Sequence, residues 1–237
     1  GDLGTLNFEG ALGGPLSDSL AGRVAVLSQN RDDYIDNGFT GKSDVYGENE
    51  EKAIKGFLAW QASDNLDFLL GAHYRDFDGT SQIFYANILG PGDNDLNNTF
   101  DRETVYFDDD ADNPVSYNNS GVNLKFNYNF GSVTLTSISA YEDADGESRG
   151  DIDGGFGAVF LPESGPGFIR FPSATQDGAD NLEQYTQELR IANNDVDKLF
   201  WQAGVYYFNS TIDISTITIG GPQQTNTLDN EAYAVFG

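Results

Sequence analysis

Apolar and polar residues alternate without interruption from Val122 to Phe130, in the order Val-Asn-Leu-Lys-Phe-Asn-Tyr-Asn-Phe. Alternation with a period of two is typical of a β-strand that has one apolar face and one polar face. In a soluble β-sandwich the polar face of such a strand contacts external water while the apolar face is buried. The sequence therefore predicts a two-faced strand here, and the question is what covers its apolar face.

The same alternation, together with β-branched and aromatic residues, predicts nine strands in all. They lie near residues 3–12, 20–31, 50–62, 66–77, 119–130, 132–143, 183–192, 198–211 and 229–237. Four expected connections are short and rich in Gly, Pro, Asp, Asn and Ser, as tight turns require: Gly13–Ser19, Ser63–Asn65, Phe130–Ser132 and Asn193–Lys198. Four are long, at 32–49, 78–118, 144–182 and 212–228. No helical period persists long enough to mark a βαβ unit.

Strict alternation of short and long connections is typical of an up-and-down transmembrane β-barrel, which has turns on one rim and external loops on the other. A ten-residue strand tilted by about 45° rises on the order of 24 Å, which matches an apolar band of about 25 Å. The strand at 66–77 fits, since Leu70 shares a face with other apolar residues while Asp67, His73 and Arg75 lie opposite. The fold class expected is all-β, an antiparallel meander that forms part of a barrel.

Aromatic residues are placed as the two belts of a membrane barrel require. Trp60, Phe130 and Trp201 lie beside short turns. Tyr74, Tyr141 and Tyr207 lie at the opposite ends of their strands. Aromatic packing in a soluble core is the alternative, but it would not explain why the aromatic positions follow the turns.

Composition narrows the classes of function. The formal net charge is −26, and a field of that sign repels nucleic acid and anionic membrane surfaces. Cysteine is absent, which excludes a disulfide-stapled domain. The 17 Phe and 12 Tyr residues favour a folded chain over a disordered acidic one. No apolar run reaches the roughly 18 residues that a transmembrane helix needs.

The chain is expected to be an internal fragment. It has no signal peptide and no methionine, and an odd strand count is unusual because bacterial single-chain barrels use even numbers. Residues 1–237 are accordingly predicted to be a partial barrel of about nine strands, with the remaining strands lying elsewhere.

Several segments, in family order, resemble the β-barrel of TonB-dependent outer-membrane receptors. They are Gly10–Asp18 with Ala21–Ala25, Asp33–Asn37, Thr136–Tyr141 running into Asp151–Asp153, Gln187–Ile191, Trp201–Phe208 and Ala232–Gly237. The resemblance implies active uptake across the bacterial outer membrane, with a ferric siderophore, haem, cobalamin or oligosaccharide as the nutrient ligand and the TonB complex as the driving partner. The family has a 22-stranded barrel closed by an N-terminal plug, and no plug or TonB box is seen here. Lipid and lipopolysaccharide would surround the barrel.

Acidic residues in the expected loops are candidate calcium ligands, because hard cations favour clustered carboxylates. The candidates are Asp143, Asp145, Glu147, Asp151 and Asp153 in one loop, and Asp108, Asp109, Asp110 and Asp112 in another. Neither spacing matches an EF-hand. We therefore expect solvated loops and no metal site, although divalent ions could bridge such loops to lipopolysaccharide.

Other candidate residues also favour structural roles. His73 is the only histidine and cannot form a zinc or haem site alone, so we expect a lumen-wall residue. Glu188 and Arg190 share a face and are expected to pair across neighbouring strands. Phe84, Tyr85, Phe160 and Phe168 in the long loops could stack on a ligand or pack among themselves. No ligand-contacting residue can be singled out.

No nucleophile, base and orienting group occur together, so the sequence predicts no enzyme and no cofactor. The function expected is the substrate-translocating wall of a TonB-dependent receptor. A passive porin-like channel is one alternative. A soluble, acidic, cell-surface β-sandwich that binds a partner is the other.

Overall fold

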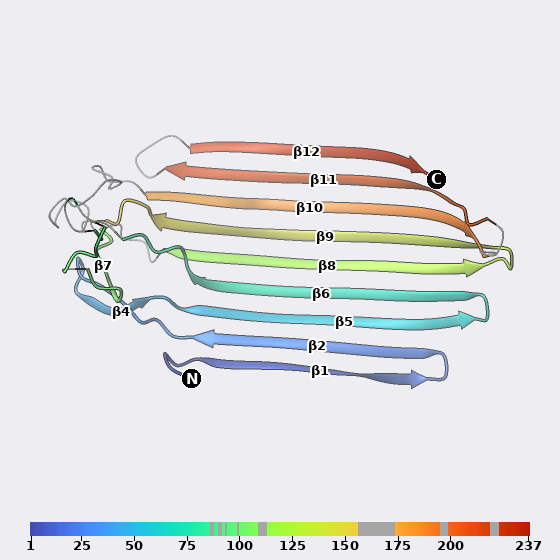
Figure 1. Cartoon of the computed structure of the whole chain (residues 1–237), viewed down its shortest axis with the longest axis horizontal. Helices are drawn as coiled ribbons and strands as arrows, with labels where there is room; N and C mark the ends of the chain where they lie inside the picture. Colours follow the sequence, from blue (N-terminus) through green and yellow to red (C-terminus); the bar gives the residue numbers. More distant parts are fainter. Residues whose placement is uncertain are drawn as a thin grey trace.

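The computed structural model describes residues 1–85, 88–89, 92, 94–98, 100–108, 113–155, 174–194, 199–218 and 223–237. Nine strands form one antiparallel sheet in the order β1-β2-β5-β6-β8-β9-β10-β11-β12 (Figure 1). They are β1 Leu6–Ser17, β2 Leu20–Arg31, β5 Asn49–Ser63, β6 Leu66–Thr80, β8 Pro114–Asn129, β9 Val133–Asp151, β10 Ala174–Asn193, β11 Gln202–Thr218 and β12 Gln223–Phe236. The sheet is an open meander whose edges are β1 and β12, which confirms the expected fold class.

The large sheet is a single layer, and within the described residues no second sheet lies over the apolar face of β8 (Figure 1). Val122 and Leu124 in β8 are 42% and 38% exposed. In a β-sandwich both side chains would be buried between two sheets. The structure therefore does not support the β-sandwich alternative. Within the residues described, no helix is long and apolar enough to cross a membrane.

Short turns join the strands at one end of the sheet. In the turn between β8 and β9, Gly131 has φ 93°, a conformation that favours glycine, and its N–H donates to Asn129 Oδ1 at 2.7 Å. The first expected turn, Gly13–Ser19, is shorter than predicted, because β1 continues to Ser17 and pairs there with Leu20.

The long connections are also shorter than expected at two places. Residues 144–151 and 174–182 extend β9 and β10, and the segment 212–228 is mostly strand, so only 219–222 separate β11 from β12. Strict alternation of short and long connections is therefore wrong at this end of the chain. Most residues in these extensions are polar or small, so the hydrophobic period is weak there while pairing continues, although Ile212 and Ile214 still alternate with polar residues. Polar cross-strand contacts accompany the pairing, such as Thr211 Oγ1 donating to Asp229 Oδ1 at 2.8 Å.

Two of the long connections contain strands that the pattern did not predict. A three-stranded sheet, β4-β3-β7, is formed by β3 Ile35–Asn37, β4 Lys42–Tyr46 and β7 Thr104–Val105. It lies at the end of the large sheet opposite the short turns (Figure 1). Its core consists of Ile35, Tyr46, Val105 and Phe107. We refer to residues 34–48 and 100–108, with Asn113 and 151–155, as the cap.

Candidate functional site

The strand register separates the side chains of the large sheet into two faces. Leu58, Leu70 and Leu124 are direct partners on β5, β6 and β8, so they lie in one row on the same face. Trp60, Phe68 and Phe126 form the next row toward the short turns, with the rings of Trp60 and Phe68 stacked at 5.4 Å. We call this the outer face. Across β5, β6 and β8 it presents a continuous apolar surface that no described residue covers.

Tyrosines mark the boundary of the outer apolar surface on the loop side. Tyr141 and Tyr185 are direct partners, as are Tyr207 and Tyr233. The second pair lies one row closer to the short turns, and the rings of Tyr185 and Tyr207 are 6.0 Å apart. The line of tyrosines therefore runs obliquely across the rows of paired residues. An aromatic belt that is parallel to a membrane surface has this course when the strands are tilted in the membrane. Trp60, Phe130 and Trp201 lie at the turn end, also on the outer face and also exposed.

The opposite face, here called the inner face, carries most of the polar side chains, although Phe57 and Leu69 also lie on it. On β8 it carries Asn123, Lys125 and Asn127, and the Asn127 amide donates to Asp67 Oδ2 at 2.8 Å. Asn127 Oδ1 in turn accepts a hydrogen bond from Thr136 Oγ1 at 2.8 Å. Polar side chains on this face are thus tied to one another across strands, an arrangement suited to a water-filled interior.

Basic side chains gather on one part of this inner face, together with carboxylates. Five side chains from neighbouring strands make up what we call the cationic wall: Arg23, Lys55, His73, Arg75 and Lys125. A groove of about 850 Å³ is lined in part by the first four of these residues. Carboxylates on the same face offset this charge, among them Glu9, which also lines the groove. Arg75 Nε donates to Glu51 Oε1 at 2.7 Å, and His73 Nε2 lies 3.2 Å from Glu142 Oε2.

The contact between His73 and Glu142 depends on a glycine. Gly121 of β8 lies between the two strands that carry these residues, opposite His73 on one side and Glu142 on the other. A Cβ atom on Gly121 would lie 2.1 Å from Glu142 Oε2. The absent side chain therefore leaves room for the carboxylate to reach across β8. The structure places His73 on the inner face, where the sequence put it.

Glu188 and Arg190 also lie on the inner face, but their pairing differs from the expectation. Arg190 Nη1 is 3.6 Å from Glu188 Oε1 on the same strand, so the pair forms along β10 and not across neighbouring strands. The register explains why: Glu188 lies opposite Ile138 and Tyr206, neither of which carries a charge. Glu188 Oε1 is buried and has no hydrogen-bond donor.

The acidic candidates are divided between strand and cap. Asp143, Asp145 and Glu147 lie within β9 and not in a loop. Asp151 and Asp153 are 1% and 6% exposed, so the expectation of a solvated loop is wrong for these two residues. Of the second group, Asp108 belongs to the cap, whereas Asp109, Asp110 and Asp112 lie outside the described residues.

The Asp151 side chain is held by backbone donors. Its Oδ1 atom accepts the N–H groups of Asp153 and Gly155 at 3.2 Å and 2.9 Å. Burial, followed by the nearby Asp153 carboxylate, raises the pKa of Asp151 to about 7. Among described residues, no group of three or more His, Cys, Asp or Glu side chains could hold a metal ion. The arrangement fits a structural carboxyl pair.

Two of the four aromatic residues considered in the long loops lie within the described residues. Tyr85 packs against the cap, where its hydroxyl donates to Arg102 O at 2.6 Å and its ring meets Phe100 edge-to-face at 5.4 Å. Phe84 is at the surface. Phe160 and Phe168 lie outside the described residues.

Sequence reasoning missed the residue that holds the cap together. Asn37 is buried, and its amide donates to Tyr46 Oη and Phe107 O, each at 3.0 Å. Its Oδ1 atom accepts the Phe39 N–H at 2.9 Å. The sequence does contain a signal for a strand in the cap, the short Thr-Val-Tyr-Phe run at 104–107, because β-branched and aromatic residues favour strands.

Comparison with known proteins bears on the fold. No protein-family model and no curated protein matches the sequence. In structure the chain is similar to the ferric yersiniabactin uptake receptor FyuA from Yersinia pestis, with a TM-score of 0.71 and 18% identity. This match covers 98% of the chain and 33% of FyuA.

The siderophore receptor PiuA from Acinetobacter baumannii is similar as well, with a TM-score of 0.51 and 11% identity over 98% of the chain and 44% of PiuA. The chain thus spans less than half the length of either receptor. The resemblance to the β-barrel of TonB-dependent outer-membrane receptors is confirmed at the level of the fold: this chain folds as part of the barrel wall found in siderophore receptors.

Proposed function

We propose that this chain forms part of the barrel wall of an outer-membrane receptor that imports a ferric siderophore or a similarly large nutrient. The observation that carries the proposal is the two-faced single sheet: an exposed apolar outer face bounded by aromatic residues, and a charged inner face behind it. Such a sheet requires lipid on one side and water on the other. The likeness to FyuA and PiuA supports a receptor over other barrels.

The proposal includes parts that lie outside this sequence. Among the described residues no strand pairs with the outer edge of β1 or β12, and the chain matches only 33% of FyuA, so further strands would complete the barrel. A plug domain would fill the lumen and connect it to the TonB complex. The cationic wall would then face that plug or a passing anionic ligand. Electrostatic attraction at such a surface is worth most where water is partly excluded.

The cap supports a role in recognition. It combines three connections into a packed unit at the rim opposite the short turns, with Phe107 completely buried. A preorganised loop cluster loses less conformational entropy on binding than free loops would. We assign the first contact with the nutrient to this rim.

The experiment is an uptake assay with the full-length receptor, expressed in an outer membrane that lacks other siderophore receptors. Cells are supplied with radioactive iron bound to each of a panel of siderophores, with TonB present or deleted. Uptake of at least one ferric siderophore that requires both the receptor and TonB would support the proposal.

Two results would contradict it. Entry of small solutes that persists without TonB would indicate a passive porin-like channel. A protein that is recovered from the aqueous fraction without detergent would indicate a soluble module.

A further inference from the structure

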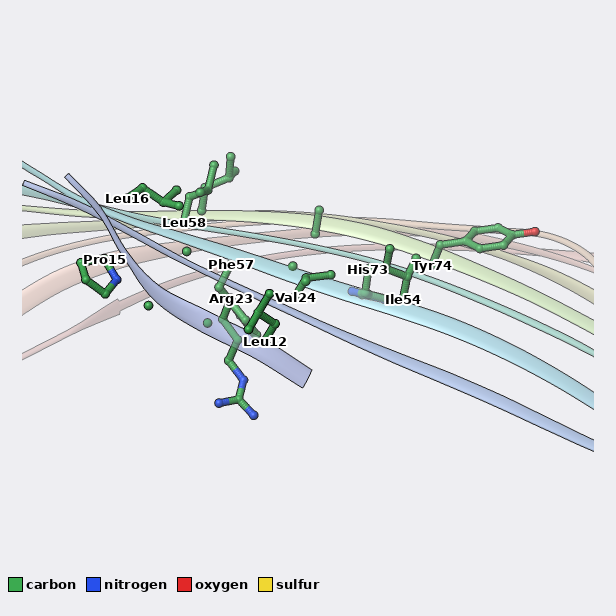
Figure 2. Close-up of a pocket in the computed structure, with 16 residues that line it drawn as sticks. Leu12, Pro15, Leu16, Arg23, Val24, Ile54, Phe57, Leu58, His73 and Tyr74 are labelled. Carbon is green, nitrogen blue, oxygen red and sulfur yellow. The ribbon is translucent and has the colours of Figure 1, made fainter. Parts of the chain in front are cut away.

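The outer face contains a groove of about 820 Å³ across β1, β2, β5 and β6. The side chains that line it from the outer face are apolar, apart from the Tyr74 hydroxyl, and include Leu12, Leu16, Val24, Ile54, Leu58 and Leu70. Figure 2 shows Leu16 and Leu58 on one side of the strands, while the Arg23 guanidinium points to the opposite side. Arg23 and His73 also line the groove, but their side chains belong to the inner face, so the groove opens on the side of the sheet opposite the cationic wall.

Missing side chains create the groove. Gly14 and Gly56 lie on the outer face, and neither has a positive φ that would require glycine. A Cβ atom on Gly14 would meet nothing within 4 Å, and one on Gly56 would meet only Arg23 O at 3.9 Å. Glycine weakens a strand interior and often marks a place where a ligand approaches the backbone closely. Here the chain leaves the space unfilled.

The position of the groove identifies the chemistry of what fills it. It runs from Leu16, next to the first short turn, to Tyr74 at the loop-side boundary of the apolar surface. It thus spans the band that faces hydrocarbon if the barrel lies in a membrane, and this step rests on the proposed function. An empty apolar groove loses dispersion contacts, and a flexible hydrocarbon chain restores them without leaving a polar group unpaired.

The charge of the short turns beside the groove indicates which kind of lipid headgroup carries that hydrocarbon chain. Asp18 and Asp64, in the two short turns beside the groove, are both exposed, and the net charge is −26. An anionic headgroup would be repelled there, whereas an ammonium group would be attracted. We propose that the groove binds an acyl chain of a zwitterionic phospholipid whose ammonium headgroup lies near Asp18 and Asp64.

The test uses the full-length receptor in vesicles of phosphatidylethanolamine and phosphatidylglycerol. The probe is phosphatidylethanolamine with a diazirine in the middle of one acyl chain, and adducts are mapped by mass spectrometry after illumination. We expect several-fold more adducts on Leu12, Leu16 and Leu58 than on Val122 and Leu124, which share the face but lie outside the groove. The same probe with a phosphatidylglycerol headgroup should label the groove less.

Gly56→Leu fills the groove with a side chain that has space to enter, and it should lower groove labelling to the level of Leu124. Ala203→Leu is the matched control, since Ala203 is an exposed small residue on the outer face of β11 outside the groove. It should change nothing. Both variants are first shown to unfold at the same temperature as the parent.

Each other outcome overturns the inference in a distinguishable way. Uniform labelling of the outer face, unaffected by Gly56→Leu, removes the lipid site but leaves the receptor proposal intact. Crosslinks between two receptor copies at the groove would assign it to a protein contact. Equal labelling of Asn123 on the inner face would contradict the membrane barrel itself.

Discussion

At the scale of single residues, the least expected feature is a polar group on the outer face. Gln187 of β10 lies in the row of Leu124, between Tyr185 and Leu189. All four bonding positions of its amide are used. The Nε2 atom donates to Ser137 Oγ and Glu188 O at 2.9 Å each, while Oε1 accepts from Ser139 Oγ at 2.5 Å and Tyr185 Oη at 3.4 Å. A satisfied amide is tolerated in an apolar environment, where an unsatisfied one is costly.

This network predicts that removing one hydrogen-bonding partner lowers the free energy of unfolding more than removing all of them does. Gln187→Ala leaves Ser137, which is 7% exposed, without its amide partner and should lower the free energy of unfolding by about 1–2 kcal/mol. The triple variant Ser137→Ala, Ser139→Ala, Gln187→Leu should be close to the parent. Urea unfolding of the full-length protein in lipid vesicles measures both. A triple variant less stable than Gln187→Ala would show that the amide contributes net stability.

Alternation with Tyr185 and Leu189 places Gln187 on the apolar face, but the sequence does not identify the partners of its amide. Around those partners the local pattern favours the opposite assignment, because Ile138 lies between two serines. The register shows the reverse, because Ser137 and Ser139 follow Leu135 and precede Tyr141 on the outer face. A period of two fixes which residues share a face but not which of the two faces meets lipid.

At the scale of elements, the cap differs most from the sequence prediction. The strand positions near 20–31 and 66–77 were recognisable because each apolar face persists for many residues. β3 and β7 contain three and two residues, too few for a period to show. Their pairing joins segments about 70 positions apart in the chain, as in the hydrogen bond from Asn37 Nδ2 to Phe107 O. Contacts of that kind depend on the assembled sheet and leave little local signal in the sequence.

The buried carboxyl pair predicts that the cap weakens as pH rises. The folded-state pKa of Asp151 is raised from 3.8 to about 7, so between these values the folded cap holds a proton that the unfolded cap releases. Stability contributed by this proton is present at low pH and is lost as pH rises toward and through about 7. Hydrogen exchange at the Val105 and Phe107 amides, corrected for intrinsic rates, should be faster at pH 8 than at pH 5.

Asp151→Asn provides the control for the pH effect. An asparagine Oδ1 can still accept the Asp153 and Gly155 N–H groups, but it cannot ionise beside Asp153 or Asp108. The variant should keep slow exchange at pH 8. Unchanged pH dependence in Asp151→Asn would assign the effect to another group.

At the scale of the whole molecule, the open sheet has consequences for this chain on its own. The edge strands expose large apolar side chains, with Leu12 on β1 at 78% and Val235 on β12 at 84%. Unpaired strand edges and apolar faces of this kind favour association with other chains. The 237-residue chain alone should therefore aggregate in buffer without detergent. A monodisperse monomer by light scattering would contradict this expectation.

The central claim is that the outer face meets lipid and the inner face meets water. Leu124 and Asn123 are neighbours on β8 that differ in this respect, and arginine at each position tests the claim directly. In the full-length barrel in vesicles, Leu124→Arg should lower the free energy of unfolding by about 2–4 kcal/mol, whereas Asn123→Arg should have little effect. Equal losses at the two positions would contradict the assignment of the faces.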